Sequence, residues 1–253
     1  MKHWLVFISW TVLIGCAGAE RTAVPPLAPR ACNGAVVRSA AELEAFAECT
    51  HVRGDLVIAA PDVVDLQPLA SLWSVSGTLG IQGSESLESL HGLARLHAVG
   101  QLAIVGNPSL RRLHGLDSLQ SADGVSVIDN PRLRDLRGLE RIERLDGLAL
   151  IDNGLVSVRG LEQLESVGDL VIADHPRLID VSALSRLRST ENLALERTPL
   201  LAPRLGFFSR LERVSGSVML SECGGAAEPE AQYLKERQEV PARTRVFVGQ
   251  STW

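Results

Sequence analysis

The side chains best suited to chemistry in this sequence are histidines, cysteines and carboxylates, but their spacing builds no catalytic site. The chain has no glycine-rich phosphate loop, no paired-cysteine metal motif and no Gly-x-Ser-x-Gly nucleophile turn. Carboxylate pairs such as Glu140 and Glu143 fall in charged turns, where no apolar pocket would raise a pKa. We find no nucleophile beside a base, so we expect no catalytic residues and no enzyme activity.

Two histidines and two arginines recur at equivalent places and form a candidate basic strip. His91 and His114 each precede a Gly-Leu pair, and the next equivalent positions hold Arg137 and Arg159. Structural zinc needs four ligands, which this set lacks, so we expect no metal and no cofactor. One reading is a contact with an anionic glycan or lipid head group. The other is a solvated ladder of turns, because acidic residues are interleaved with the strip: Asp135, Glu140 and Glu162.

The first cysteine belongs to an N-terminal segment that resembles a targeting sequence. An apolar stretch from Trp4 to Ile14 follows a short positive start, which is the layout of a secretory signal peptide. The stretch is shorter than the about 20 residues that cross a bilayer. It ends in Leu13-Ile14-Gly15-Cys16, which resembles the bacterial lipobox and so implies cleavage after residue 15 and lipidation of Cys16. The alternative is an ordinary signal peptide with an incidental cysteine.

Export and a lipid anchor together predict the location of the protein. Ala17, and not an aspartate, follows Cys16, and by analogy with Gram-negative lipoproteins this favours the outer membrane, on its periplasmic or cell-surface side. Residues 16–31 are rich in proline and alanine without periodicity and predict a semi-stiff tether. We expect residues 1–15 to be removed and the rest to contact the membrane through its lipid.

The other three cysteines would meet oxidising conditions after export, so we expect a disulfide. Cys32 and Cys49 flank a short helical pattern that begins at Ser39. Ser39 followed three residues later by Glu42 has the form of a capping box. The favoured pairing is a Cys32–Cys49 bridge that braces this helix. Cys223 is then left over, and we expect it to be a buried free thiol.

Composition restricts the class of protein and of partner. The chain has 253 residues, of which 45% are hydrophobic and 22% charged, so most of it is expected to be globular. Aromatic residues make up 4% and the formal net charge is −5. Because nucleic-acid binders need a basic surface or stacking aromatics, we expect no nucleic-acid partner.

The body of the chain, residues 54–220, is a repeat of 22–23 residues. Each of seven units opens with two aliphatic residues two positions apart, as in Leu56 and Ile58, which predicts a strand with one buried face. Leucines at period three follow, as in Leu87 and Leu90. Because period three fits an amphipathic α-helix poorly, it favours extended or 3₁₀-like arcs. Stacking of such units predicts a β-rich solenoid, a parallel β-helix of about seven coils.

The turn after each strand carries a polar residue that predicts a structural ladder. Asn107, Asn130 and Asn153 hold this place in successive units, and His175 and Thr198 hold it in the next two. Asparagine can bond to the backbone of its own turn and of the next coil, which satisfies amides that the bend leaves unpaired. We therefore expect these residues to stabilise the turns and not to bind a ligand.

The outward side of the predicted sheet is the main candidate binding face. Its side chains are small, apolar in the middle and polar at the margins. Exposed apolar patches often mark interaction sites. The alternatives are packing against another part of this chain, or strand propensity alone. The candidate residues are Ala103, Val105, Ser126, Ile128, Ala149, Ile151 and Val171.

The segment from Glu48 to Ile58 and the repeat itself carry a resemblance. ECTHVRGDLVI is similar to the Cys-Thr-x-Ile-x-Gly-x-Leu-x-Ile opening motif of the leucine-rich-repeat-like receptor L domain, and the recurrent Gly-x-Leu-x-Ile-x-x-Asn-Pro unit is similar to that family's repeat. This module is found in insulin-receptor and EGF-receptor ectodomains and in many bacterial surface lipoproteins. The resemblance covers about residues 32–220.

The resemblance implies a right-handed solenoid, a disulfide-braced N-terminal cap over residues 32–53, and binding rather than catalysis. The chain has no cysteine-rich module, transmembrane helix or kinase, so a hormone-receptor function is not carried over. After Leu220 the repeat stops, and residues 221–253 predict a C-terminal cap with a helix over 228–238 and a strand over 245–248.

These observations predict a non-catalytic outer-membrane or surface lipoprotein. Its solenoid would present a face to a protein or glycan partner whose identity the sequence does not define. The alternative is a structural envelope lipoprotein that has no specific ligand.

Overall fold

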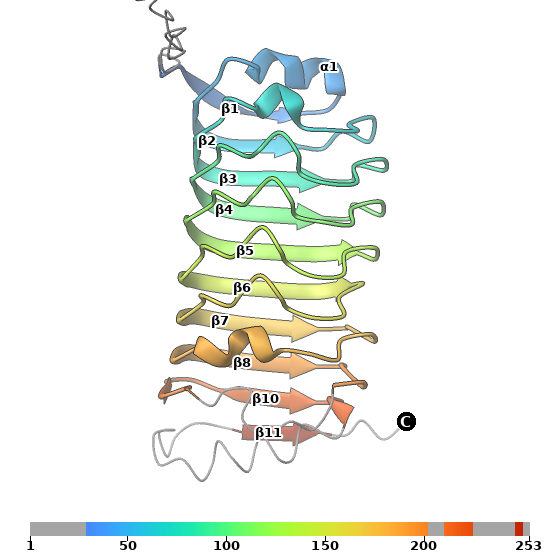
Figure 1. Cartoon of the computed structure of the whole chain (residues 1–253), viewed down its shortest axis with the longest axis vertical. Helices are drawn as coiled ribbons and strands as arrows, with labels where there is room; N and C mark the ends of the chain where they lie inside the picture. The colour runs from blue at the N-terminus through green and yellow to red at the C-terminus, as the bar shows by residue number, and fades with distance from the viewer. Residues whose placement is uncertain (1–28, 202–209, 225–245, 250–253) are drawn as a thin grey trace, which may run out of the picture.

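Strands stacked one above another form the body of the molecule, a parallel β-solenoid of about eight turns (Figure 1). The computed structural model describes residues 29–201, 210–224 and 246–249. The predicted solenoid is therefore confirmed. The periodic units predict about seven coils, and an earlier strand that lacks their period joins the same sheet ahead of them. The expected signal peptide, Cys16, most of the predicted tether and the expected helix over 228–238 lie outside the described residues.

The described strands run parallel in a single sheet, in the order β1-β2-β3-β4-β5-β6-β7-β8-β10-β11, and β9 pairs with β8 beside β10. The strands are β1 Ala31–Val37, β2 His51–Ile58, β3 Ser74–Gln82, β4 Ala98–Val105, β5 Ser121–Asn130, β6 Arg144–Asn153, β7 Ser166–Ala173, β8 Ser189–Glu196, β9 Arg213–Val214, β10 Val218–Ser221 and β11 Val246–Gly249. The last strand lies one residue beyond the expected span of 245–248.

The aliphatic pairs of the repeat form columns through the core. Leu79 pairs with Leu102, and Leu102 with Val125, so equivalent side chains lie directly above one another. The second position of each strand stacks in the same way, for example Ile81 on Ile104. These side chains are at most 1% exposed. Because each coil covers the edge of its neighbour, the stack is expected to unfold cooperatively.

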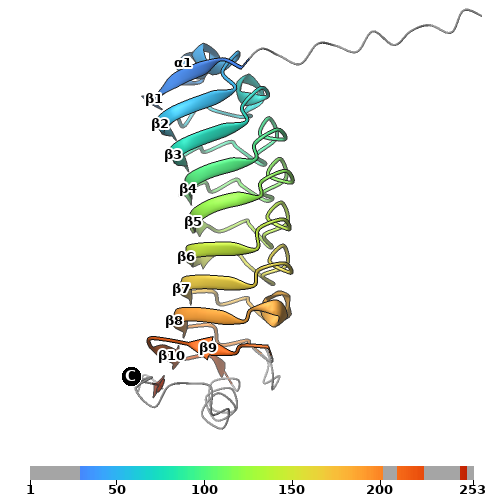
Figure 2. The same ribbon diagram turned by 90° about the vertical axis from the view of Figure 1, so that its left-hand side faces the viewer.

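The period-three leucines lie in turning arcs and not in α-helices. Leu93 N donates to the Leu90 carbonyl at 3.1 Å, and Leu96 N donates to the Leu93 carbonyl at 2.9 Å. These three-residue steps keep each leucine pointing inward, fully buried. In two coils the arc becomes a short 3₁₀ helix, η2 over Gln67–Leu69 and η3 over Ser182–Arg186. The strands line one side of the stack and the arcs the other (Figure 2).

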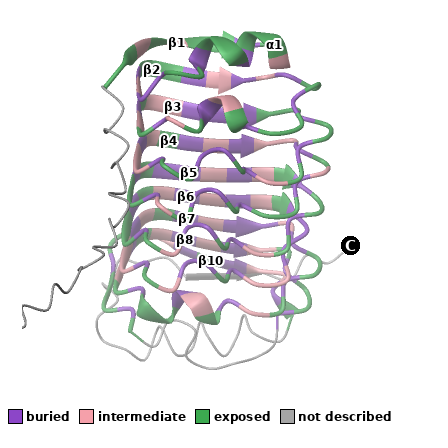
Figure 3. Cartoon of the chain, turned by 45° about the horizontal axis from the view of Figure 1, so that its top comes forward, coloured by how far each residue is buried: buried purple, intermediate pink, exposed green. Residues whose placement is uncertain are grey.

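The N-terminal cap contains a shorter α-helix than the sequence predicts. The expected helix from Ser39 divides into α1, Ala40–Leu43, and η1, Glu44–Phe46. Ser39 accepts from Glu42 N at 3.3 Å, as a capping box requires, but Glu42 Oε2 accepts from Arg38 N at 2.7 Å instead of from Ser39 N. Together with β1 these turns cover the first end of the core (Figure 3).

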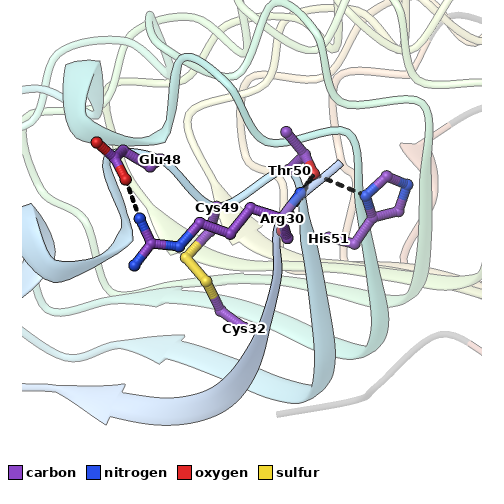
Figure 4. Close-up of a disulfide and its surroundings, with 6 residues drawn as sticks. All are labelled: Arg30, Cys32, Glu48, Cys49, Thr50 and His51. Carbon is purple, nitrogen blue, oxygen red and sulfur yellow. Dashed lines mark hydrogen bonds and ion pairs between the residues drawn. A yellow bond between two sulfur atoms is a disulfide. The ribbon is translucent and has the colours of Figure 1, made fainter. Parts of the chain in front are cut away.

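A disulfide ties this cap together. Cys32 on β1 is bonded to Cys49, which follows η1, with the two Cα atoms 5.8 Å apart. The predicted pairing is therefore confirmed. Beside the bond, Arg30 N donates to Thr50 Oγ1 at 2.7 Å, and the Arg30 guanidinium pairs with Glu48 (Figure 4). The cap is thus fastened to the start of β2 by a covalent bond and by polar contacts.

Candidate functional site

The seven residues of the candidate binding face lie together on the outward side of the sheet. Ala103 pairs with Ser126, Ser126 with Ala149, and Ala149 with Val171, one on each of β4 to β7. A second row runs beside the first, in which Val105 pairs with Ile128, and Ile128 with Ile151. All seven side chains are half-buried, whereas the residues that lie between the two rows, such as Ile104 and Val127, are buried in the core. The period-two pattern predicted this division.

The face has a shallow hollow along its polar margin. Gly124 and Gly147 are paired there, between Gln101 on one side and Asp169 on the other. The Gln101 side chain lies over Gly124, where a Cβ would stand 2.3 Å from its Oε1 atom. A Cβ on Gly147 would meet nothing nearer than 4.0 Å. The hollow has a volume of about 170 Å³, so the face is nearly flat and suits an extended contact more than an enclosed small molecule.

Only one of the two rows has the polar margins that the sequence predicts. The row through Ile128 becomes polar on both sides, with exposed Gln82 at one and half-buried Glu196 followed by Ser221 at the other, as the pattern predicts. The row through Ser126 instead continues through further strands to Val36 at one end and through Met219 to β11 at the other. These two side chains are 45% and 39% exposed. Val36 and Met219 were not predicted because β1 precedes the seven periodic units and β10 follows the last of their regular spacings.

The turn ladder forms as predicted. Asn130 is fully buried, and its Nδ2 donates to the carbonyls of Ile104 at 3.1 Å and Ile128 at 2.9 Å. Its Oδ1 accepts from Asn107 N at 3.2 Å. Asn153 repeats the pattern one coil further on, with Nδ2 donating to its own turn and to the coil before. The asparagines therefore satisfy backbone groups that would otherwise be buried without partners.

The ladder is longer than the asparagines alone indicate. Ser84 donates from Oγ to the Ala60 carbonyl at 3.2 Å and is fully buried. At the other end, Cys223 Sγ donates to the carbonyls of Leu195 at 2.9 Å and Ser221 at 3.2 Å. Burial raises the pKa of the Cys223 thiol, which keeps the proton that it donates. The expected buried free thiol is confirmed, and it is the last described member of the ladder.

The predicted basic strip lies on the turns and not on the sheet. The rings of His91 and His114 stack on adjacent coils, with centroids 6.4 Å apart. His114 lies 3.4 Å from Asp117, and Arg137 pairs with Asp135 at 2.8 Å. Arg159 borders a small hollow with Glu162 and Asp180. The strip is thus interleaved with carboxylates, which supports its interpretation as a solvated ladder of turns.

The described part of the chain offers no metal site and no helix that could span a membrane. Residues 29–201 and 210–224 hold no cluster of three or more His, Cys, Asp or Glu that could bind a metal ion. A surface hollow of about 970 Å³ at the starts of β5 and β6 is lined by charges of both signs, among them Asp123, Glu143 and Arg144. Over the same described residues, no helix has the length and apolar character to cross a membrane.

The sheet face is therefore the best-defined candidate interaction surface, formed by rows of half-buried side chains on a rigid parallel sheet. A scan against protein-family models finds no family that matches the chain, and a search of curated proteins finds no match either.

Proposed function

We propose that this protein is a non-catalytic recognition module, exported and lipid-anchored at the outer membrane or cell surface. Its solenoid binds a protein or glycan partner through the outward face of the sheet. The observation that carries the proposal is the pair of rows through Ser126 and Ile128, which align half-buried, mostly apolar side chains over four adjacent strands.

The rigidity of this surface supports a binding role. Each of β4 to β7 is hydrogen-bonded to a strand on both sides. A surface held in this way loses little conformational entropy when a partner binds. The candidate residues include no tryptophan, tyrosine or arginine, which are the usual strong contributors to interfaces. The partner would supply those side chains and place them over small residues such as Ala103 and Ala149.

The proposed location of the protein is inferred from its N-terminal sequence. The lipobox-like segment ending in Cys16 favours export and lipidation, and the receptor L-domain resemblance favours binding over catalysis. Three acyl chains on one cysteine would give stable membrane attachment. The solenoid would then stand at the membrane with its long sheet face open to a partner.

The test is affinity capture from native envelope extract with the soluble chain 17–253 as bait. A second bait carries Ala103→Arg and Ala149→Arg, which place two long cations on the face. A matched control carries Ala70→Arg and Ala94→Arg, because both of these alanines are exposed in the arcs, away from the sheet. Circular dichroism and thermal unfolding verify that all three baits fold alike.

We expect the unmodified bait and the Ala70/Ala94 control to retain the same partner, and the Ala103/Ala149 variant to lose it. Equal retention by all three baits would contradict the assignment of the sheet face as the site. Recovery of no partner by any bait would contradict recognition itself and favour the structural envelope role.

A further inference from the structure

An arginine-lined groove lies on the turn side of the solenoid, away from the sheet face. It has a volume of about 510 Å³ and is bordered by the turns that follow β4, β5, β6 and β7. One aspartate, Asp135, contributes to its walls. The arginines that line the groove are Arg111, Arg112, Arg132, Arg134, Arg137 and Arg177.

The groove forms where one coil is a residue shorter than its neighbours. The spacing from Asn130 to Asn153 is 23 residues, whereas the spacing from Asn153 to His175 is 22. The missing residue falls in the turn, where Gly154 alone stands in place of a Pro-Arg pair. The turn is therefore drawn in against the coil before it.

Gly154 shows how closely the shortened turn packs. It is buried, and its N–H donates to the Asn130 carbonyl at 3.1 Å. A Cβ at this position would lie 2.1 Å from the Pro131 carbonyl oxygen. The neighbouring coils keep their longer turns, and these place Arg132 and Arg177 at equivalent positions on either side of the gap. The recess is thus built by the backbone and bordered by guanidinium groups.

The charges in the groove are mostly unbalanced. Arg111 pairs with Glu88 at 3.7 Å, and Arg137 with Asp135 at 2.8 Å. The other four arginines, though exposed, have no carboxylate within ion-pair distance in the part of the chain that the structure describes. Like charges held together repel one another and raise the free energy of the folded state. A bound anion would remove that cost.

We propose that this groove binds a ligand that carries several phosphate groups. Guanidinium forks match phosphate oxygens in paired hydrogen bonds, and several of them around one recess favour a multiply charged ligand over a single ion. The volume admits a compact head group or a short phosphorylated sugar. Either a soluble glycan with several phosphates or the head group of a lipid that carries more than one phosphate provides this chemistry. The site is separate from the sheet face and does not depend on the function proposed for that face.

The probe is myo-inositol hexakisphosphate, titrated into chain 17–253 by isothermal calorimetry, with uncharged myo-inositol as the blank. The test variant is Arg132→Gln with Arg177→Gln, which removes the two cations beside the gap. The control variant is Arg141→Gln with Arg144→Gln. It removes the same charge from exposed arginines that line the separate mixed-charge hollow.

We expect the test variant to bind the probe at least about tenfold more weakly, because two charge-assisted contacts are lost. The control variant should stay within about twofold, since its distant charges are screened by salt. Equal weakening in the two variants would overturn the proposal, because binding would then follow net charge alone. Absence of probe binding at low ionic strength, together with absence of vesicle binding that depends on Arg132 and Arg177, would also overturn it.

Vesicles distinguish the two sources of phosphate. Binding to vesicles that contain cardiolipin, whose head group carries two phosphates, but not to phosphatidylcholine vesicles, lost in the Arg132/Arg177 variant, would support the groove with a lipid-borne ligand. Binding of the soluble probe with the same dependence on the two arginines, but no vesicle binding, would support it with a soluble one. Vesicle binding that persists in the Arg132/Arg177 variant, with no groove-dependent binding of the soluble probe, would overturn the proposal.

Discussion

His175 occupies a ladder position at which the three preceding coils have asparagine. The side chain is fully buried, and its Nε2 lies 3.5 Å from Asn153 Nδ2. Burial lowers the pKa of His175 to about 4, because the charged imidazolium would lose its hydration. The folded protein therefore keeps this ring neutral at pH values where an exposed histidine is already protonated.

This depressed pKa makes stability depend on pH in one direction. Above about pH 7 the ring is neutral in both states and contributes no pH dependence. Below an unfolded-state pKa of about 6.5, His175 binds a proton in the unfolded chain but not in the folded chain. The free energy of unfolding therefore decreases as the pH falls toward about 4. At about pH 5 the loss from this residue is about 2 kcal/mol.

Replacing His175 with asparagine should remove this loss. When the pH is lowered from about 7.5 to about 5, we expect the free energy of unfolding of the unmodified protein to fall by about 2 kcal/mol more than that of the His175→Asn variant. The measurement is urea unfolding of both proteins at the two pH values. If both proteins lost the same free energy over that interval, His175 would not be the group that titrates.

Sequence alone predicted the asparagines of the ladder but not its full extent. Asn-Pro recurs as a visible motif, so Asn107 and Asn130 stood out. Ser84 and Cys223 were missed because they do not resemble asparagine. At the equivalent position after a strand, a hydroxyl and a thiol donate to backbone carbonyls instead of an amide. Their role follows from their position after a strand and not from their residue type, and only the structure fixes that position.

At the scale of the coil, a glycine at the bend after the basic strip is required by its backbone. Gly115 has a φ of +114°, and a Cβ there would lie 2.1 Å from the Leu90 carbonyl oxygen in the preceding coil. Both the conformation and the close approach of successive coils exclude a side chain. The position therefore controls how tightly one turn stacks on the next.

Substitution of this glycine should weaken the stack. We expect Gly115→Ala to lower the free energy of unfolding by about 2–4 kcal/mol, because the backbone is strained and the coils are forced apart. Gly147→Ala is the matched control, since the nearest atom to a Cβ there is the Asp169 carbonyl oxygen at 4.0 Å, and it should change stability by less than about 1 kcal/mol. Denaturant unfolding of the two variants measures both effects. Equal stability would contradict the role assigned to Gly115.

The strands of the regular repeats were predictable because their inward positions are aliphatic at period two, while β1 was not. In β1 only Val37 is fully buried and most side chains are exposed, so its sequence lacks the alternation that identifies a strand. Its place in the sheet comes from pairing with β2. The Cys32–Cys49 bond was predictable because the two cysteines flank a helical pattern.

For the whole molecule, the repeat defines the core closely and the surface only loosely. Many kinds of side chain fit at an outward position without disturbing the core. The 22–23-residue period therefore carries little information about which surface residues bind a ligand. The sheet face was predictable because a flat parallel sheet places equivalent residues in rows. The arginine groove was not, because it follows from one missing residue beside Gly154 and from how far that turn is drawn inward.

The central claim is that the sheet face meets a partner in the cell, and site-specific photo-cross-linking tests it most directly. A photoreactive phenylalanine analogue replaces Ala149 on the face in one strain and Ala94 in the arcs in another. Irradiation of intact cells should give a discrete cross-linked product from position 149 and none from position 94. A product from position 94 alone, or the same products from both positions, would contradict the claim that the sheet face is the recognition surface.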